Sequence, residues 1–304
     1  MGQAQVVDVD GKRLSLSNLD KVLYPSAGFA KGQVIDFYAR IAPVLLPHLA
    51  GRPVTMKRYP DGVDGEYFYE KNAPKHRPDW VKTAAIWSRH NRRNINFLLV
   101  DDLPTLTWLA NLASLEIHPS LALAKDISCP TMMVFDLDPG PPANIVQCSQ
   151  VGLWLRDIFA HWGIESFPKT SGSKGLQIYV PLNTPTSYEE TKEFAHAIAR
   201  LLEQEHRGMI VSDMKKELRT GKVFVDWSQN DEHKTTVTAY SLRARQRPWV
   251  SAPLTWKEVE TALRTKKIDA IHFEADEVVG RIKKMGDLFE QVLTLKQKLP
   301  SAVG

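Results

Sequence analysis

The first hundred residues combine one clear helical pattern with short strand-like runs. Apolar residues between positions 32 and 46 recur at the spacing of a single helix face, which predicts an amphipathic helix. Short β-prone runs lie on either side of the turn at Pro60 to Gly62. Pro104 precedes an apolar segment, and we expect a helix over 106–117 that ends near His118. The expected strands are residues 52–58, 67–70 and 95–100.

From residue 131 onward, strand-like runs alternate with amphipathic helices. A helix is expected over 145–162, and capping boxes that begin at Ser187 and Thr255 predict two more. The chain after Thr255 is mostly helical and charged by the same criteria. The pattern predicts an α+β fold with a weak boundary near Cys129. The expected strands are residues 132–137, 176–181 and 223–227, with 237–242 as a further candidate.

Composition excludes several classes of protein. The 304 residues are 43% hydrophobic, which is typical of a globular chain of one large domain or two fused modules. Cys129 and Cys148 are too few for a disulfide framework, and neither lies in a metal-binding motif. No segment has the length and hydropathy of a signal peptide or a membrane span. We therefore expect a cytoplasmic protein without a membrane partner.

The charged residues are unevenly distributed. The net charge of +4 does not by itself indicate a nucleic-acid binder. Aromatic residues at 67–69 and Trp80 lie among the basic clusters, a combination that could contact phosphates and bases, although each cluster alone is typical of a solvated face. The basic clusters are residues 57–58, 71–77, 89–93, 215–222 and 243–247.

Two predicted strands end in carboxylates. Alternation along 132–138 places Asp136 and Asp138 on one face, just before the strand stops at Pro139. Asp226 similarly ends the apolar strand at 223–227. If the two strands are adjacent, the three carboxylates would repel unless cations neutralised them, and hard oxygen ligands suit two Mg²⁺ or Mn²⁺ ions. The alternative for the Asp-x-Asp pair is ordinary turn chemistry.

A glycine-rich turn lies between these strands. Residues 169–175 include Lys174, and their small side chains would let backbone amides approach a phosphate. The turn precedes a strand and lacks the spacing of a Walker loop, so an ordinary hairpin turn is the alternative.

Several motifs occur in one order along the chain. They are FDLDPG at 135–140, TSGSKGL at 170–176 and VDWSQN at 225–230, preceded by shorter matches at 20–25, 51–53, 70–72 and 115–118. In this order and spacing they resemble the polymerase domain of bacterial ligase D, within the archaeo-eukaryotic primase superfamily. The resemblance extends from about Leu16 to the helical tail.

The resemblance implies a fold and a function. It implies a single primase-polymerase domain over 1–304, with an N-terminal α/β module at 1–129, an RRM-like catalytic core of antiparallel or mixed sheets at 130–255, and a helical segment at 256–304. The implied activity is template-directed addition of nucleoside triphosphates, preferably ribonucleotides, with two Mn²⁺ or Mg²⁺ ions. The implied substrate is gapped or broken double-stranded DNA with a 5′-phosphate, in end joining or excision repair at the bacterial nucleoid.

The resemblance also implies roles for individual residues. Asp136, Asp138 and Asp226 match the catalytic metal ligands, and His118 matches an active-site histidine beside the sugar and phosphates. Positions that match a 5′-phosphate pocket are Asn18, Lys21 and Lys31, and positions that match a base-stacking aromatic are Phe68 and Tyr69. Positions expected near the nucleotide, or near primer and template for some arginines, are Lys57, Arg58, Ser171, Lys174, Gln177, Arg219, Gln229, Lys234, Arg243 and Arg245.

Two departures from the family qualify these expectations. Gln177 stands where the family usually has histidine, and an amide cannot carry a proton charge, so phosphate stabilisation there should be weaker. The sequence also lacks a ligase motif and a histidine-rich phosphoesterase segment, so we expect a stand-alone polymerase or an excised domain that works with a DNA ligase and an end-binding protein in trans. Two alternatives stay open: a primase that starts chains, and a protein that bridges DNA ends with weak catalysis.

Overall fold

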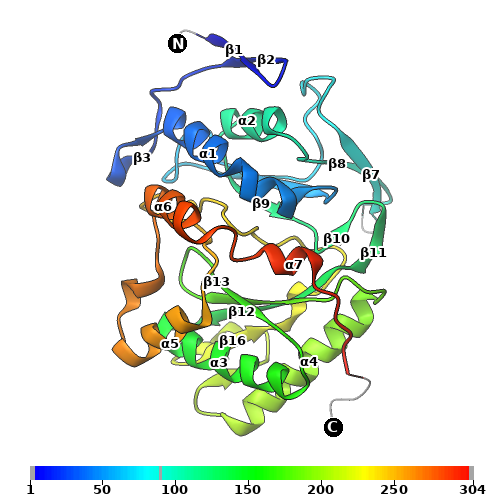
Figure 1. Cartoon of the computed structure of the whole chain (residues 1–304), viewed down its shortest axis with the longest axis vertical. Helices are drawn as coiled ribbons and strands as arrows, with labels where there is room; N and C mark the ends of the chain where they lie inside the picture. The colour runs from blue at the N-terminus through cyan, green and yellow to red at the C-terminus, as the bar shows by residue number, and fades with distance from the viewer. Residues whose placement is uncertain (1–3, 89–90, 301–304) are drawn as a thin grey trace. The chain divides into compact units, whose positions relative to one another are not determined.

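The computed structural model describes residues 4–88 and 91–300, so Arg89 of the basic cluster at 89–93 lies outside the described residues. The chain forms two compact units, whose segments alternate along the sequence (Figure 1). None of the helices in the described ranges is long and apolar enough to span a bilayer. Unit 1 comprises Met1–Ser120, Thr235–Val250 and Phe273–Asp287, and unit 2 comprises Leu121–Lys234, Ser251–His272 and Leu288–Gly304. The limits at 129 and 255 stay a prediction.

Unit 1 is built on a five-stranded sheet. Its strands run β6-β5-β8-β7, and β9 also pairs with β5. The predicted helix at 32–46 is confirmed as α1 (Lys31–Leu49), whose apolar face is buried. The sheet strands are β5 (Val54–Arg58), β6 (Phe68–Glu70), β7 (Thr83–Ser88), β8 (Arg93–Leu98) and β9 (Ser114–Pro119). The other elements are β1 (Gln5–Val9), β2 (Lys12–Leu16), β3 (Val22–Tyr24), β4 (Phe29–Ala30), α2 (Leu103–Asn111) and α6 (Ala275–Met285).

The predicted helix over 106–117 is wrong in its second half. Helix α2 ends at Asn111, and Ala113 takes a left-handed backbone conformation with φ 56°, which turns the chain out of the helix. Residues 114–119 then form β9, which pairs antiparallel with β5 and is buried throughout. A short apolar run fits a buried strand as well as a buried helix. His118 is therefore a strand residue.

Unit 2 is built on a second five-stranded sheet, in the order β13-β14-β12-β16-β15. Only the β15–β16 pair is parallel, so the predicted α+β class is confirmed. Segment 237–242 forms no strand, since Leu242 makes only an isolated bridge. The sheet strands are β12 (Met132–Pro139), β13 (Phe167–Thr170), β14 (Leu176–Pro181), β15 (Ile210–Val211) and β16 (Val223–Asp226), and β10 (Ala122–Leu123) and β11 (Asp126–Pro130) pair separately. The helices are α3 (Ile145–His161), α4 (Tyr188–Glu205), α5 (Trp256–Thr265) and α7 (Glu290–Thr294).

Helix α3 covers one face of this sheet. Gly152 of α3 lies so close that a Cβ placed there would be 3.3 Å from Ile178 and 3.8 Å from Leu137. The side chains that alternate with these, including Asp136 and Gln177, point to the opposite face. The capping boxes at Ser187 and Thr255 are confirmed at the starts of α4 and α5.

Candidate active site

Asp136 and Asp226 lie directly opposite each other on the antiparallel strands β12 and β16. Opposed residues on one sheet face have Cβ atoms only about 4.5–5.5 Å apart. Asp138 lies two residues further along β12 on the same face. The two strands, whose adjacency was only a condition of the prediction from sequence, are thus neighbours in the sheet, and their carboxylates share one face.

A polar row crosses the sheet at this level. Gln177 on β14 is opposite Asp136, and Lys169 on β13 is opposite Gln177. The Lys169 side chain is fully buried, its Nζ donates to Ser251 Oγ at 2.6 Å, and it lies 5.4 Å from the Tyr179 ring centroid. The row therefore has a cation at one end and two carboxylates at the other.

Negative charge in this row is only partly compensated. Burial raises the pKa of Asp136 to about 7, and the charges of Asp226 and Asp138 add to the increase. Lys169 and a hydrogen bond from Gln177 act in the opposite direction on the pKa of Asp136. Their effect is smaller, so Asp136 holds a proton far more readily than an ordinary aspartate.

The other two carboxylates have neighbours of their own. Asp226 accepts hydrogen bonds from Ser228 N at 2.9 Å, Ser228 Oγ at 2.6 Å and Gln229 Nε2 at 2.9 Å. Lys234 Nζ in turn donates to Ser228 Oγ at 2.5 Å. Asp138 lies 3.6 Å from Arg219, whose guanidinium is 3.8 Å from the Phe224 ring centroid. Three of the predicted nucleotide-binding residues thus lie around the carboxylates in unit 2, namely Gln229, Lys234 and Arg219.

The carboxylates fit a hard divalent cation by their chemistry. Across residues 4–88 and 91–300, no three acidic, histidine or cysteine side chains converge as they would around an ion. The donors are nevertheless all carboxylate oxygens, which Mg²⁺ and Mn²⁺ prefer. Beside the effect of burial, the charges of Asp226 and Asp138 also raise the pKa of Asp136, so the carboxylates repel one another and a cation would relieve that repulsion.

The glycine-rich turn is held by its own hydroxyl groups. Ser171 Oγ accepts hydrogen bonds from Ser173 N and Gly175 N, both at 3.2 Å, and Lys174 is exposed. A Cβ on Gly175 would lie 1.9 Å from the Leu137 carbonyl oxygen, so the turn packs backbone to backbone against β12. Only glycine fits at this contact, which fixes the turn beside the carboxylates.

A second cluster of charged residues lies in unit 1, around Glu116 on β9. Glu116 is only 2% exposed. Its Oε2 lies 2.9 Å from His118 Nε2, and its Oε1 lies 3.9 Å from Lys57 Nζ and 3.4 Å from Arg243 Nε. The backbone N–H of Ala244 also donates to Oε1 at 3.1 Å. We call these residues the Glu116 cluster.

The pKa values in the Glu116 cluster follow from its charges. Burial by itself would raise the pKa of Glu116, but the hydrogen bond from His118 and the charges of Arg243 and Lys57 hold it well below its ordinary value. Burial lowers the pKa of His118, and Arg243 and Lys57 lower it further, against the opposing effect of Glu116. At neutral pH, Glu116 is therefore a carboxylate and His118 a neutral imidazole.

Aromatic rings enclose the lysine of this cluster. Lys57 Nζ lies 5.3, 4.3 and 5.2 Å from the ring centroids of Tyr59, Tyr67 and Tyr69. Phe68 and Tyr69 are 53% and 59% exposed, as a residue that stacks on a base must be. This part of unit 1 therefore places the Lys57 ammonium group next to exposed aromatic rings that could stack on a base.

The remaining predicted residues also lie in unit 1. Backbone hydrogen bonds connect Lys21 N to Asn18 O at 3.0 Å and Lys31 N to Lys21 O at 2.8 Å, so the predicted 5′-phosphate residues lie together. Burial and the charge of Lys21 lower the pKa of Lys31 to about 8. Arg58 pairs with Glu70 at 2.8 Å, and Arg245 is exposed.

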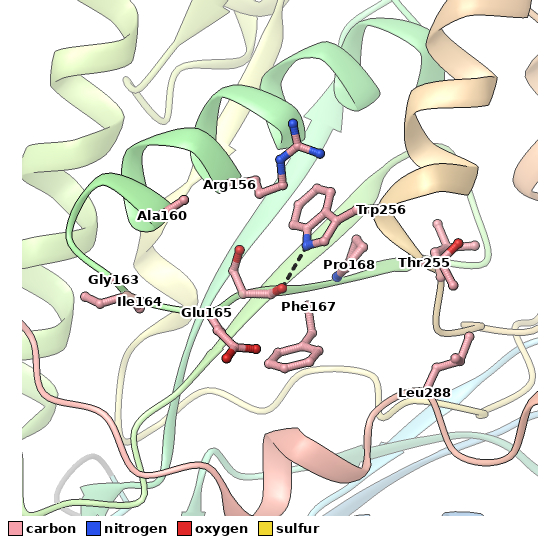
Figure 2. A pocket seen from close by; sticks show the side chains of 12 residues that line it. Arg156, Ala160, Gly163, Ile164, Glu165, Phe167, Pro168, Thr255, Trp256 and Leu288 are labelled. Atoms are coloured by element: carbon pink, nitrogen blue, oxygen red, sulfur yellow. Dashed lines mark hydrogen bonds between the residues drawn. The ribbon is translucent and has the colours of Figure 1, made fainter.

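Sequence reasoning assigned no role to Glu116 or Lys169. Each is a charged residue in a short strand that also contains apolar residues, Leu115 and Ile117 in β9 and Phe167 and Pro168 in β13, and that was the available signal. A pocket of about 530 Å³ in unit 2 was also not expected, and none of the predicted residues lines it. Figure 2 shows its Trp256 donating to the Ser166 carbonyl beside Arg156 and Phe167.

An Asp-x-Asp strand pairs here with a strand that ends in a third aspartate, on the sheet face opposite α3, and this arrangement fits the class of primase-polymerase nucleotidyltransferases. The family model described as "LigD, primase-polymerase domain" matches residues 30–289, and the chain belongs to this family.

Curated relatives agree with the family model. The multifunctional non-homologous end joining protein LigD of Mycobacterium bovis is 41% identical over 92% of this chain, and the bifunctional LigD of Bacillus subtilis is 33% identical over 90%. The chain spans only 37% and 43% of the lengths of these two relatives. The polymerase domain of Mycobacterium tuberculosis ligase D in complex with DNA matches with a TM-score of 0.85 and 39% identity, over 94% of this chain and 99% of that one.

Proposed function

We propose that this chain is a template-directed repair polymerase that adds nucleotides, preferably ribonucleotides, at short gaps and broken DNA ends. The observation that carries the proposal is the opposed pair Asp136 and Asp226, with Asp138 on the same face. Similarity to a polymerase domain in complex with DNA supports the same activity. Non-homologous end joining is the favoured context, because it is in the names of the relatives.

The three carboxylates would hold two divalent ions, with Mn²⁺ favoured over Mg²⁺. Bound ions would supply Lewis-acid stabilisation of the transferring phosphate. The chain's own basic residues would bind the nucleotide. In unit 2 these are Ser171, Lys174, Arg219 and Lys234, with Gln177 and Gln229 as neutral hydrogen-bonding groups, and in unit 1 they are Lys57, Arg58, Arg243 and Arg245.

The DNA-binding part of the proposal rests on unit 1. Asn18, Lys21 and Lys31 would bind the 5′-phosphate across a gap, and Phe68 or Tyr69 would stack on a base. Because Lys31 is protonated only below a pH of about 8, its attraction for the phosphate should weaken above that pH. A DNA ligase and an end-binding protein would complete the repair reaction at the nucleoid.

Primer extension on a gapped duplex tests the proposal. With Mn²⁺ and ribonucleoside triphosphates, we expect extension that Asp136→Ala reduces by at least about 10³-fold, because a metal site supplies several kcal/mol of charge stabilisation. The 5′-phosphorylated gap should be preferred over the 5′-hydroxyl gap, and the double variant Lys21→Ala, Lys31→Ala should remove that preference.

Three results would contradict parts of this proposal. Undiminished extension by Asp136→Ala would reject the metal site, and an unchanged gap preference in the lysine variant would reject the phosphate pocket. Tight binding of gapped DNA without extension in either Mg²⁺ or Mn²⁺ would instead indicate a protein that bridges DNA ends.

A further inference from the structure

An ion pair lies among the residues predicted to bind the 5′-phosphate. Lys21 Nζ is 2.7 Å from Asp61 Oδ1, and these two side chains are 40% and 76% exposed. Lys31 is only 6% exposed, and across residues 4–88 and 91–300 no carboxylate pairs with it. A buried ammonium group without a counter-ion is costly, so Lys31 favours an anionic ligand. One lysine of the pocket is therefore available to a phosphate, and the other is already occupied.

A turn that follows β5 holds Asp61 beside Lys21. Gly62 has φ 84°, and a Cβ placed there would lie 2.9 Å from the Leu23 carbonyl oxygen. The N–H of Val63 donates to the same oxygen at 2.8 Å. Since Leu23 is two residues after Lys21, these backbone contacts fix both members of the ion pair relative to each other. The fold itself therefore places Asp61 next to Lys21.

The charge of the ligand determines the effect of Asp61. A terminal phosphate monoester carries about −1.5 to −2 charges at pH 7, so two ammonium groups match it closely. Lys21 and Lys31 supply two positive charges when both are protonated, and the Asp61 carboxylate cancels one of them. The pocket therefore attracts the phosphate less than its two lysines alone would.

Lys21 cannot hold Asp61 and a phosphate at once without a cost. An ammonium group has three N–H donors, so two acceptors can bind it in principle. Two anionic oxygens that each lie about 2.8 Å from one nitrogen are at most about 5.6 Å apart. That separation is well below the Debye length of about 10 Å at 0.1 M salt, so the two anions repel. A bound 5′-phosphate should therefore displace Asp61 from Lys21, and the loss of the ion pair weakens its binding.

We propose that Asp61 competes with the 5′-phosphate for Lys21 and thereby limits how tightly the gap end is held. The proposal rests on the proposed repair function and on its 5′-phosphate pocket. Lys31 supplies the constant part of the attraction. A reaction that joins DNA ends consumes the 5′-phosphate, because this group forms the new phosphodiester bond. The pocket must release the phosphate before that reaction, and Asp61 favours the release.

Binding of gapped DNA tests the competition without any chemistry. A gapped duplex with a 5′-phosphate or a 5′-hydroxyl is titrated with the full chain at about 0.1 M salt, without nucleotide, and followed by fluorescence anisotropy. Asp61→Asn should bind the 5′-phosphorylated gap about fivefold more tightly, as expected for one exposed ion pair. Its affinity for the 5′-hydroxyl gap should change by less than about twofold.

Asp64→Asn is the matched control. Asp64 is an exposed acid of the same loop, and it has no ion-pair partner within the described ranges. This variant changes the net charge by the same amount, so both affinities should change by less than about twofold. In Lys21→Ala, the further change Asp61→Asn should give no gain, because the competition needs Lys21. A gain of the full size in either case would overturn the proposal.

Sealing of a nick tests the release step. The substrate is a nicked duplex with a 5′-phosphate, bound by an excess of this chain, to which a purified ATP-dependent DNA ligase is added. Asp61→Asn should slow sealing about fivefold relative to the unsubstituted protein, because less of the DNA end is free at any moment. Asp64→Asn should not slow it. Equal sealing rates for the two variants would overturn the role in release.

The binding results separate the pocket from the competition. Equal binding of both gaps by the unsubstituted protein would reject the 5′-phosphate pocket, and this inference with it. A clear preference for the 5′-phosphate that Asp61→Asn leaves unchanged or weakens would reject the inference alone, because Asp61 would then have no effect on Lys21 or would orient it toward the phosphate.

Discussion

The polar row of unit 2, which runs from Asp226 through Asp136 and Gln177 to Lys169, and the Glu116 cluster of unit 1 each contain an acid whose pKa is shifted. The two pKa values are shifted in opposite directions. Burial raises the pKa of Asp136 and would by itself raise that of Glu116. Asp136 has two further aspartates beside it and its pKa rises to about 7, whereas Glu116 lies among an imidazole and two cations and its pKa falls. Burial acts in the same direction on both acids, so the opposite directions of their pKa shifts come from the neighbouring charges.

The difference has a functional meaning under the proposed activity. A site with excess negative charge suits divalent cations, and a site with excess positive charge suits the phosphates of a nucleotide. The two clusters also differ in how they are held. Both rest on strand pairing, since Lys57 is directly opposite Glu116 as Asp226 is opposite Asp136, but only the row is also fixed by the close backbone contact of Gly175 with β12.

The largest expected effect comes from breaking the backbone support of the row. Gly175→Ala would place a Cβ 1.9 Å from the Leu137 carbonyl, between Asp136 and Asp138, and should lower the free energy of unfolding by roughly 3 kcal/mol or more. Gly208→Ala, with no atom within 4 Å of the new Cβ, is the control for urea denaturation. Because Gly175 belongs to unit 2 and His118 to unit 1, the substitution should leave the NMR signals of the His118 imidazole unchanged. Equal stability of the two variants would contradict the close contact.

A smaller effect should follow from removing the cation of the row. Lys169→Met would leave Ser251 Oγ without its donor at 2.6 Å and would let the pKa of Asp136 rise further, at a cost of roughly 2 kcal/mol. Ser251→Ala keeps the charge and should cost about 1 kcal/mol. Denaturation of both variants at pH 6 and pH 8 separates the hydrogen bond from the charge. Indistinguishable pH dependence would show that Lys169 does not compensate Asp136.

The smallest effects should appear as opposite slopes of stability against pH. Asp136 has a raised pKa, so its contribution is greatest at low pH and is lost as the pH rises through about 7. Glu116 has a lowered pKa, so its contribution is present above its ordinary value of 4.5 and is lost as the pH falls below it. In metal-free protein, Asp136→Asn should flatten the fall in stability between pH 3.8 and about pH 7, and Glu116→Gln should flatten the fall in stability below pH 4.5. Each change should amount to a few degrees in Tm, or about 1 kcal/mol. If both variants changed the dependence of stability on pH in the same direction, the opposite pKa shifts of Asp136 and Glu116 would be refuted.

Much of the fold could be predicted from local pattern. Helix α1 and the capped helices α4 and α5 were expected, because amphipathic spacing and capping boxes are local signals. The helix predicted through Ile117 failed where strand pairing with β5 decided the structure of residues 114–119. That pairing joins segments far apart in the sequence, and no local pattern contains it.

The sequence by itself determined that Asp136 and Asp138 share a face, since alternation along a strand is a local property, and its ordered motifs indicated the family. Only the tertiary structure placed Asp226 opposite Asp136 and brought Lys169 to the other end of the same row. Only the tertiary structure also brought Arg243 to Glu116 from more than a hundred residues away. The direction of a side chain follows from the backbone conformation of a few residues. The charges that neighbour it come from segments far away in the sequence, and strand order and chain topology decide which of them lie close.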